Sequence, residues 1–118
     1  MENSRAVQEK SFSFALRTVR LYKHLCDDKR EFILSKQLLR SGTAIGALVR
    51  EAEQAESKPD FIHKLAIALK EANETEYWLE LLHQSDYLDD KGFKSISSDL
   101  KQLLKLLTAI IKKAKRLT

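Results

Sequence analysis

Two pairs of residues have the spacing of metal ligands on a helix. Glu80 and His83 form an E-x-x-H motif, which carboxylate-bridged di-metal bundles use twice, together with two further carboxylates. The nearest second pair, Asp60 with His63, lies on the same predicted helix. At a rise of 1.5 Å per residue, His63 and His83 would stand about 30 Å apart, too far to share one metal. The sequence therefore predicts no metal site.

Other signatures of catalytic chemistry are missing from the sequence. It contains no Gly-rich phosphate loop, no G-x-S-x-G and no paired C-x-x-C. His24 has no Glu or His at helical spacing, and Cys26 is expected to pack as a small apolar side chain. We therefore expect a protein that is not an enzyme and that uses no cofactor.

Cations near the two ends of the chain form the strongest candidate for a binding surface. Residues 1–26 carry a net charge of +3, residues 27–90 of −6 and residues 91–118 of +7. Five of the cations are spaced by seven, four, seven and four residues, so on a helix they fall within roughly 60° of one another. Such a row suits the phosphate backbone of RNA or DNA; an ordinary solvated face is the alternative. The candidate nucleic-acid ligands are Arg17, Arg20, Lys23, Lys94, Lys101, Lys105, Lys112 and Arg116.

The composition predicts one soluble, helical domain. The 118 residues are 43% hydrophobic and 32% charged, and 3 Gly with 1 Pro leave few breaks for long helices. A single cysteine excludes an internal disulfide and favours a reducing, cytoplasmic compartment. We expect neither a signal peptide nor a membrane span, because no apolar run approaches the ~20 residues that a span needs.

Apolar residues recur with alternating spacings of three and four in four segments. This periodicity predicts helices over about residues 5–26, 31–56, 58–85 and 93–117. In the first helix the predicted core line is Phe12, Ala15, Val19, Tyr22 and Cys26.

The connections between these helices are short, which forces neighbouring helices to run antiparallel. Ser57 is a good N-cap, Pro59 fits a first turn, and Asp60 completes a capping box, while Asp89 or Asp90 would cap the last helix. We therefore predict an all-α fold, an antiparallel up-down-up-down four-helix bundle that forms a single domain over residues 1–118. The first and last helices, and with them the basic segments, would be neighbours, and the acidic middle helices would form the other side.

Two glycines stand one turn apart inside the second predicted helix. Each costs about 1 kcal/mol relative to Ala, so a close approach by another helix should offset the loss. That helix belongs either to the same bundle or to a second subunit. Apolar residues off the core line of the third helix favour self-association. The candidate subunit interface is Leu39, Gly42, Gly46, Val49, Ile62, Ala66, Leu69 and Trp78.

Arg40 can be placed by counting along the antiparallel pair. The turn between the second and third helices centres near residue 57, so Arg40 and Glu74 lie at equal distances from it, with Glu71 one turn away. We predict that Arg40 forms an ion pair with Glu74 or Glu71. A solvated charge is the alternative, because exposed ion pairs contribute little.

Residues 37–82 contain the motifs Q-L-x-R-S-G-T-x-I-G-A, E-A, S-K-x-D-F-I-x-K and K-E-A-x-E-T-x-Y-W-L. This segment resembles the bacterial 23S rRNA intervening-sequence proteins, four-helix bundles encoded within insertions in large-subunit ribosomal RNA genes. The same fold is similar to the accessory variability determinant of diversity-generating retroelements. The rest of the chain matches in length and pattern only. The family-typical residues are Arg40, Ser41, Gly42, Gly46, Glu51, Ser57, Asp60, Phe61, Glu71, Glu74 and Trp78.

The resemblance implies a homopentameric ring with a basic surface and a non-catalytic association with nucleic acid or a reverse transcriptase. One departure concerns Ala44 and Leu48, which stand where the family commonly has a Ser and an Asn. If those polar residues serve function, this chain has lost part of it. If they serve packing, Leu48 thickens the core.

Two functions follow from these patterns. The first is a nucleic-acid-binding homo-oligomer that uses the basic surface of the first and last helices. No aromatic residues are interleaved with those cations, so a platform for single-strand bases is not expected. The second is a protein-interaction scaffold or accessory subunit, for example of a reverse transcriptase, which a retroelement beside the gene would support.

Overall fold

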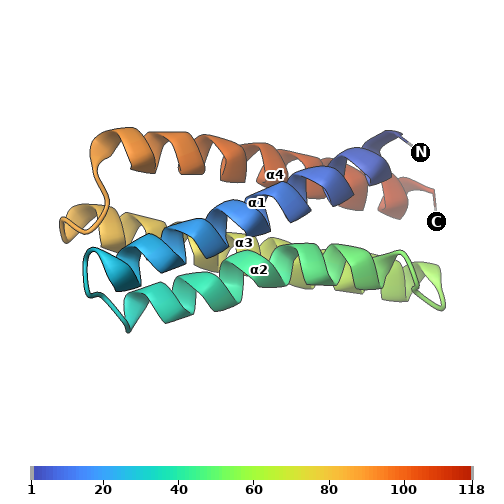
Figure 1. The fold of residues 1–118 in the computed structure, drawn as a ribbon. Coiled ribbons are helices and arrows are strands. Elements are labelled where there is room, and N and C mark those ends of the chain that lie inside the picture. Colours follow the sequence, from blue (N-terminus) through green and yellow to red (C-terminus); the bar gives the residue numbers. More distant parts are fainter. Residues whose placement is uncertain (1, 118) are drawn as a thin grey trace.

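The computed structural model describes residues 2–117, and this part of the chain forms four helices in a bundle of 48 × 22 × 19 Å (Figure 1). Each helix packs on two neighbours, so that α1 contacts α2 and α4, and α3 contacts the same two helices. The predicted all-α up-down-up-down bundle is confirmed. The helices are α1 (Glu2–Asp27), α2 (Leu34–Ala52), α3 (Lys58–Gln84) and α4 (Asp90–Arg116).

The two ends of the bundle differ in what they carry. Both chain termini lie at the same end as the turn between α2 and α3, and the other two turns lie at the opposite end (Figure 1). Within residues 2–117, no helix is sufficiently long and apolar to span a membrane.

Polar side chains fix where α3 and α4 begin. Ser57 is the N-cap of α3, and its hydroxyl accepts a hydrogen bond from the backbone N–H of Asp60 at 3.2 Å. The Asp60 carboxylate accepts in return from the N–H of Glu56, one residue before the position that a standard capping box uses. Asp89 caps α4 by accepting from the N–H of Gly92 at 2.7 Å, so this helix begins three residues earlier than predicted.

The start of α2 depends on a cap that the sequence did not reveal. Helix α2 begins at Leu34 instead of residue 31, because Arg30 adopts a left-handed backbone (φ 55°) and Glu31 folds back over the first turn. The Glu31 carboxylate accepts from the N–H groups of Ile33, Leu34 and Ser35, the last at 2.7 Å. Burial raises the pKa of this carboxyl, but these N–H donors outweigh it and hold the pKa below its ordinary range.

The end of α2 also differs from the prediction. The helix stops at Ala52 instead of residue 56, and the chain tightens into turns in which the N–H of Gln54 bonds to the carbonyl of Glu51. Glu53 and Glu56 follow, and negative charge disfavours continuation at a helix C-terminus.

The core lines of α3 and α4 follow the predicted periodicity, and that of α2 follows it in part, because Gly42 and Val49 are buried as well. The predicted line of α1 is wrong. The buried line of α1 includes Ser11 and Thr18, whose hydroxyls bond to the helix's own carbonyls of Gln8 and Phe14. The residues that the sequence assigned to the core of α1 lie instead between the side that faces α2 and the side that faces solvent. Phe12, for example, is 53% exposed. The buried residues of α1 are Val7, Ser11, Phe14, Thr18 and Leu25.

These small polar residues meet the two glycines of α2. A Cβ on Gly42 would lie 2.6 Å from Thr18 Cγ2, and one on Gly46 would lie 3.2 Å from the carbonyl oxygen of Ser11. The close approach that offsets the glycines is therefore made by α1 of the same chain. This is the first of the two alternatives that the sequence left open.

We expect Gly42→Ala to destabilise the protein by about 1–2 kcal/mol, because the overlap with Thr18 outweighs the better helix propensity of Ala. Denaturant unfolding monitored by circular dichroism measures the effect. Adding Thr18→Ala removes the overlapping atoms, so the double variant should be more stable than Gly42→Ala alone. Additive losses in the two single variants would contradict the contact.

The Glu31 cap should make stability depend on pH. Because the folded state lowers the pKa of Glu31, the cap stabilises the protein above the ordinary pKa of a glutamate and is lost as the pH falls through the lowered value. We expect Glu31→Gln to cost about 1 kcal/mol near pH 7 and progressively less as the pH falls through the lowered pKa, because the native side chain then also becomes neutral. The unfolding free energies of the native protein and the variant, measured from neutral to acidic pH, test this expectation. A difference independent of pH would contradict an ionised cap.

Candidate nucleic-acid interface

The core of α4 determines which of its residues face solvent. Ile96, Leu100, Leu103 and Leu107 are almost fully buried against the other helices. Residues on the opposite side of the same helix must therefore point outward. All five predicted cations of α4 lie on that side and are exposed, in a row along the helix: Lys94, Lys101, Lys105, Lys112 and Arg116.

Helix α1 lies beside this row, and two of its side chains donate hydrogen bonds to α4. The Arg17 guanidinium donates to Asp99 Oδ2 at 2.6 Å and to the hydroxyl of Ser95 at 3.0 Å. Lys10 Nζ donates to Gln102 Oε1 at 3.0 Å. Arg17 therefore connects two helices. The candidate phosphate ligands are the exposed cations around it.

Two of those cations belong to α1. Arg20 and Lys23 are exposed, and Arg20 lines a hollow of about 280 Å³ that also includes Gly92 and Ile96 of α4. The structure thus places the predicted cations of α1 and α4 on adjacent helices. We define the basic surface as the seven exposed members of the predicted set: Arg20, Lys23, Lys94, Lys101, Lys105, Lys112 and Arg116.

The distribution of charge differs from the prediction in one respect. Helix α4 carries eight Lys or Arg and two Asp, as expected. Helix α2, however, has three cations and one Glu, so it is not acidic. The acidic side is α3, with three cations and five carboxylates, and the connection before it. The block of sequence 27–90 obscured this because its negative charge lies largely outside α2.

Further cations lie on α4 beyond the predicted row. Lys91 and Lys113 are exposed. The predicted set of ligands did not include them, because it contained only cations spaced by seven and four residues, whereas cations occur along the whole helix. Cations in the last turn of α4 also interact favourably with the helix dipole, which lets this end of the helix tolerate their density.

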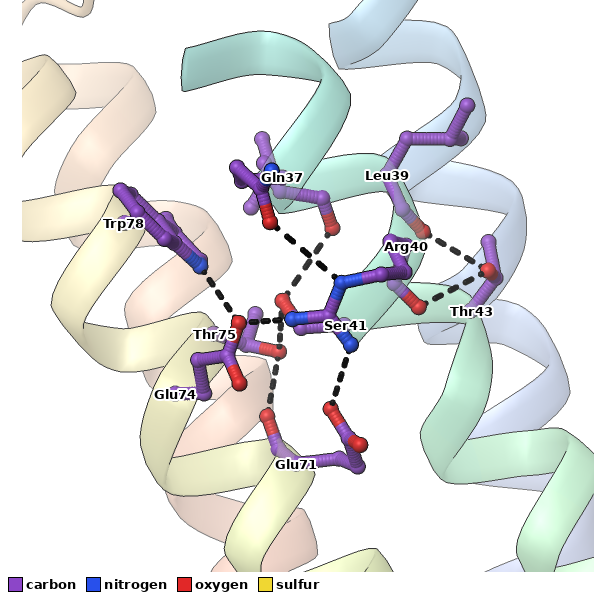
Figure 2. Close-up of polar contacts among 10 residues, drawn as sticks. Gln37, Leu39, Arg40, Ser41, Thr43, Glu71, Glu74, Thr75 and Trp78 are labelled. Atoms are coloured by element: carbon purple, nitrogen blue, oxygen red, sulfur yellow. Dashed lines mark hydrogen bonds and ion pairs between the residues drawn. The ribbon is translucent and has the colours of Figure 1, made fainter. Parts of the chain in front are cut away.

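Arg40 lies on another part of the bundle and pairs with both carboxylates named by the counting argument (Figure 2). Its guanidinium donates to Glu71 at 3.3 Å and to Glu74, and Glu74 also accepts from the Trp78 indole N–H at 2.9 Å. The predicted ion pair is confirmed. Arg40 therefore connects α2 to α3.

Beneath this ion pair, two buried hydroxyls continue the connection. Thr75 Oγ1 lies 3.0 Å from Ser41 Oγ and 2.7 Å from the backbone carbonyl of Glu71 (Figure 2). Both residues are fully buried, and such groups are tolerated in a core because they are hydrogen-bonded. The most recognisable motifs of the sequence thus build the contact between α2 and α3.

The predicted subunit interface does not form one surface. Gly42 and Val49 are buried in the bundle, and Gly46 faces Ser11 of α1, so these three residues serve packing within the chain. The others are partly exposed and remain candidates: Leu39, Ile62, Ala66, Leu69 and Trp78. Leu48, which stands where the family commonly has a polar residue, packs against the core, so packing explains this difference from the family. Ala44 is partly buried.

Two of the histidines, His24 and His83, have ordinary hydrogen-bond partners. His83 Nε2 lies 2.6 Å from Asp90 Oδ1 and its ring stacks on Phe93. The hydrogen bond from His83 lowers the pKa of the Asp90 carboxyl. His24 Nδ1 lies 2.7 Å from Asp28 Oδ2. In the part of the chain that the structure describes, no group of three or more His, Cys, Asp or Glu has the arrangement of a metal site.

Comparison with known proteins identifies the chain's relatives. The model of the 23S rRNA-intervening sequence protein family matches residues 3–109. The chain belongs to this family. A crystal structure of a protein of unknown function from the S23 ribosomal protein family of Bacteroides thetaiotaomicron VPI-5482 is 56% identical, with a TM-score of 0.93. The match covers 93% of this chain and 98% of that one. No curated protein matches the sequence.

The match extends the family relationship beyond the motifs of α2 and α3. It includes α1 and most of α4, for which the sequence offered only length and pattern. As an intervening-sequence protein, the chain therefore shares with the family the first three helices and most of the fourth. The basic surface remains to be interpreted from its own residues.

Proposed function

We propose that this intervening-sequence protein is a non-catalytic RNA- or DNA-binding protein that contacts phosphates through the basic surface of α1 and α4. One observation carries the proposal: α4 exposes a straight row of five cations, while one of its two Asp residues is already paired with Arg17. The row spans 22 residues, or about 33 Å of helix. A charged row of this length can follow several phosphates.

The contacts expected from this surface are electrostatic. Each neutralised phosphate releases counterions, so five contacts to a duplex give a slope of about −4.5 in a plot of log affinity against log salt. The side chains that face outward from α4 between the cations are small and polar, such as Ser98 and Thr108. The proposal is therefore one of affinity for phosphate and not of sequence recognition.

A second candidate is a protein-interaction scaffold or accessory subunit, for example of a reverse transcriptase. The observation that favours it is apolar exposure at the connection between α1 and α2, where Phe32 is 50% and Ile33 76% exposed. Exposed apolar side chains of this size typically mark contact with another protein. This surface is separate from the cations of α4, so the two functions predict different sensitive residues.

Self-association belongs to the same proposal. The family resemblance implies a homopentamer, and the residues that we assign to subunit contacts are the partly exposed apolar ones of α2 and α3: Leu39, Ile62, Ala66, Leu69 and Trp78. A ring would repeat the basic surface and multiply weak phosphate contacts into useful avidity.

Reversing three charges tests the proposed function. We expect the triple variant Lys101→Glu, Lys105→Glu and Lys112→Glu to bind a short RNA duplex at least a hundredfold more weakly than the native protein at 50 mM salt. Its salt dependence should also become shallow. Fluorescence anisotropy across a salt series measures both quantities, and light scattering on the same samples reports whether the assembly is unchanged.

A variant with the same net charge serves as the control. Lys29→Glu, Lys36→Glu and Lys70→Glu reverse three exposed cations of the α1–α2 connection, α2 and α3. It should lose much less affinity, since only the overall field changes. Equal losses in both variants, or a native affinity insensitive to salt, would contradict a phosphate-binding surface on α4.

A further inference from the structure

A pocket lies on the outer side of the bundle between α1 and α2. It has a volume of about 400 Å³, and its rim includes Phe12, whose ring the sequence had assigned to the core. In the structure this ring is 53% exposed, with the Arg50 guanidinium carbon 5.9 Å from the ring centroid. An exposed phenyl ring beside a guanidinium is a surface on which planar, electron-rich groups stack.

The lining of the pocket combines an apolar floor with a few polar groups. Ala15, Gly46 and Ala47 present little or no side chain, so the space between the helices stays open. Gln8 supplies an amide, and Thr43 supplies a hydroxyl that donates to the carbonyl of Leu39 and can therefore accept a hydrogen bond from a ligand. The carboxylate that reaches the pocket, Glu51, is paired with Lys64 at 3.2 Å, which offsets its negative charge.

The register of α1 on α4 places this pocket near the basic surface. Phe12 lies between Lys10 and Arg17, which bond to Gln102 and Asp99 of α4. The ring is therefore level with the segment of α4 that contains Lys101. A nucleic-acid strand whose phosphates contact α4 at this level needs to cross only the width of α1 to reach the pocket.

We propose that the pocket binds an unpaired nucleobase of a nucleic acid whose phosphates lie on the basic surface. The inference rests on the proposed function and adds to it a preference for unpaired bases. The base stacks on Phe12 and is flanked by Arg50, while Gln8 and Thr43 face its polar edge. A base in a duplex cannot enter, because its faces are covered by its neighbours in the stack. The protein should therefore prefer single strands, or duplexes with a bulge, over perfect duplexes.

Charge favours this occupant over a purely apolar one. Arg50 lines the pocket, the pocket's carboxylate Glu51 is paired with Lys64, and the cations of α4 lie on the other side of α1. The group that enters is therefore expected to be attached to an anionic chain. A second copy of the protein or an apolar side chain of another protein would leave Arg50 without an anionic partner. Those occupants are outcomes of the test below.

The experiment compares single-stranded RNA, carrying one 2-aminopurine, with the perfect duplex of the same sequence. For the native protein we expect tighter binding of the single strand and quenching of the 2-aminopurine fluorescence as it stacks. Phe12→Leu should weaken single-strand binding about tenfold and abolish quenching, while duplex binding stays unchanged. Ala47→Leu, which fills the pocket and leaves the ring in place, should have the same effect.

Phe32→Leu is the matched control. Phe32 is similarly exposed and lies under the guanidinium of Arg30 at 5.2 Å, but it belongs to the connection between α1 and α2 and does not line the pocket. This variant should bind both RNAs as the native protein does. Circular dichroism confirms that each variant is folded.

The outcomes separate this inference from the proposed function. Equal, salt-dependent binding of both RNAs, unaffected by Phe12→Leu, would overturn the base pocket and leave the phosphate surface standing. Two results together support both proposals. The α4 charge reversal loses binding to both RNAs, and the pocket variants lose binding to the single strand alone. If Ala47→Leu changes only the mass measured by light scattering, the pocket binds a second copy and the inference is wrong. Absence of binding to either RNA would overturn both proposals.

Discussion

The close contact of α1 with α2 at Thr18–Gly42 and Ser11–Gly46 determines the rest of the structure. Two glycines without side chains allow the helices to approach until side chain and backbone touch. This contact fixes the rotation of α1 about its own axis. The rotation directs Phe14 into the core and Arg17 toward α4, and it leaves Phe12 outside. Both the basic surface and the pocket depend on this orientation.

Sequence periodicity predicted the core lines of α3 and α4, and most of that of α2, because residues with alternating spacings of three and four mark them. It failed for α1 because Ser11 and Thr18 look polar in the sequence, although their hydroxyls are satisfied by the helix's own carbonyls and their small size fits against glycine. A second line of apolar residues ran beside them and was mistaken for the core. The glycines of α2 were the signal that small residues should face them.

The candidate site was predictable to the extent that it depends on spacing. The exposed row on α4 followed from a repeat of seven and four, and the Arg40 pairing followed from antiparallel counting. Contacts of single residues did not follow. The engagement of Arg17 with Asp99 and the exposure of Phe12 depend on the rotation of one helix against another, which no local pattern specifies. The Glu31 cap is local, but it depends on the left-handed turn at Arg30, which the sequence did not indicate.

The structure separates the recognisable part of the chain from the part that we propose binds. The motifs of α2 and α3 form one buried hydroxyl pair, the Arg40 ion pairs and the glycine contact, all of which hold helices together. The basic surface is carried by α4 and one side of α1. Such a division lets the bundle remain constant while the charge on α4 sets the affinity for a phosphate chain.

Amide chemical shifts recorded by NMR during a titration with a short RNA test this division most directly. The account predicts shift changes concentrated along α4 between Lys94 and Arg116 and on α1 around Phe12 and Arg20. The Trp78 indole N–H, hydrogen-bonded to Glu74 across the bundle from this surface, should not shift. Changes centred on Trp78 and Arg40, with α4 unaffected, would contradict the account.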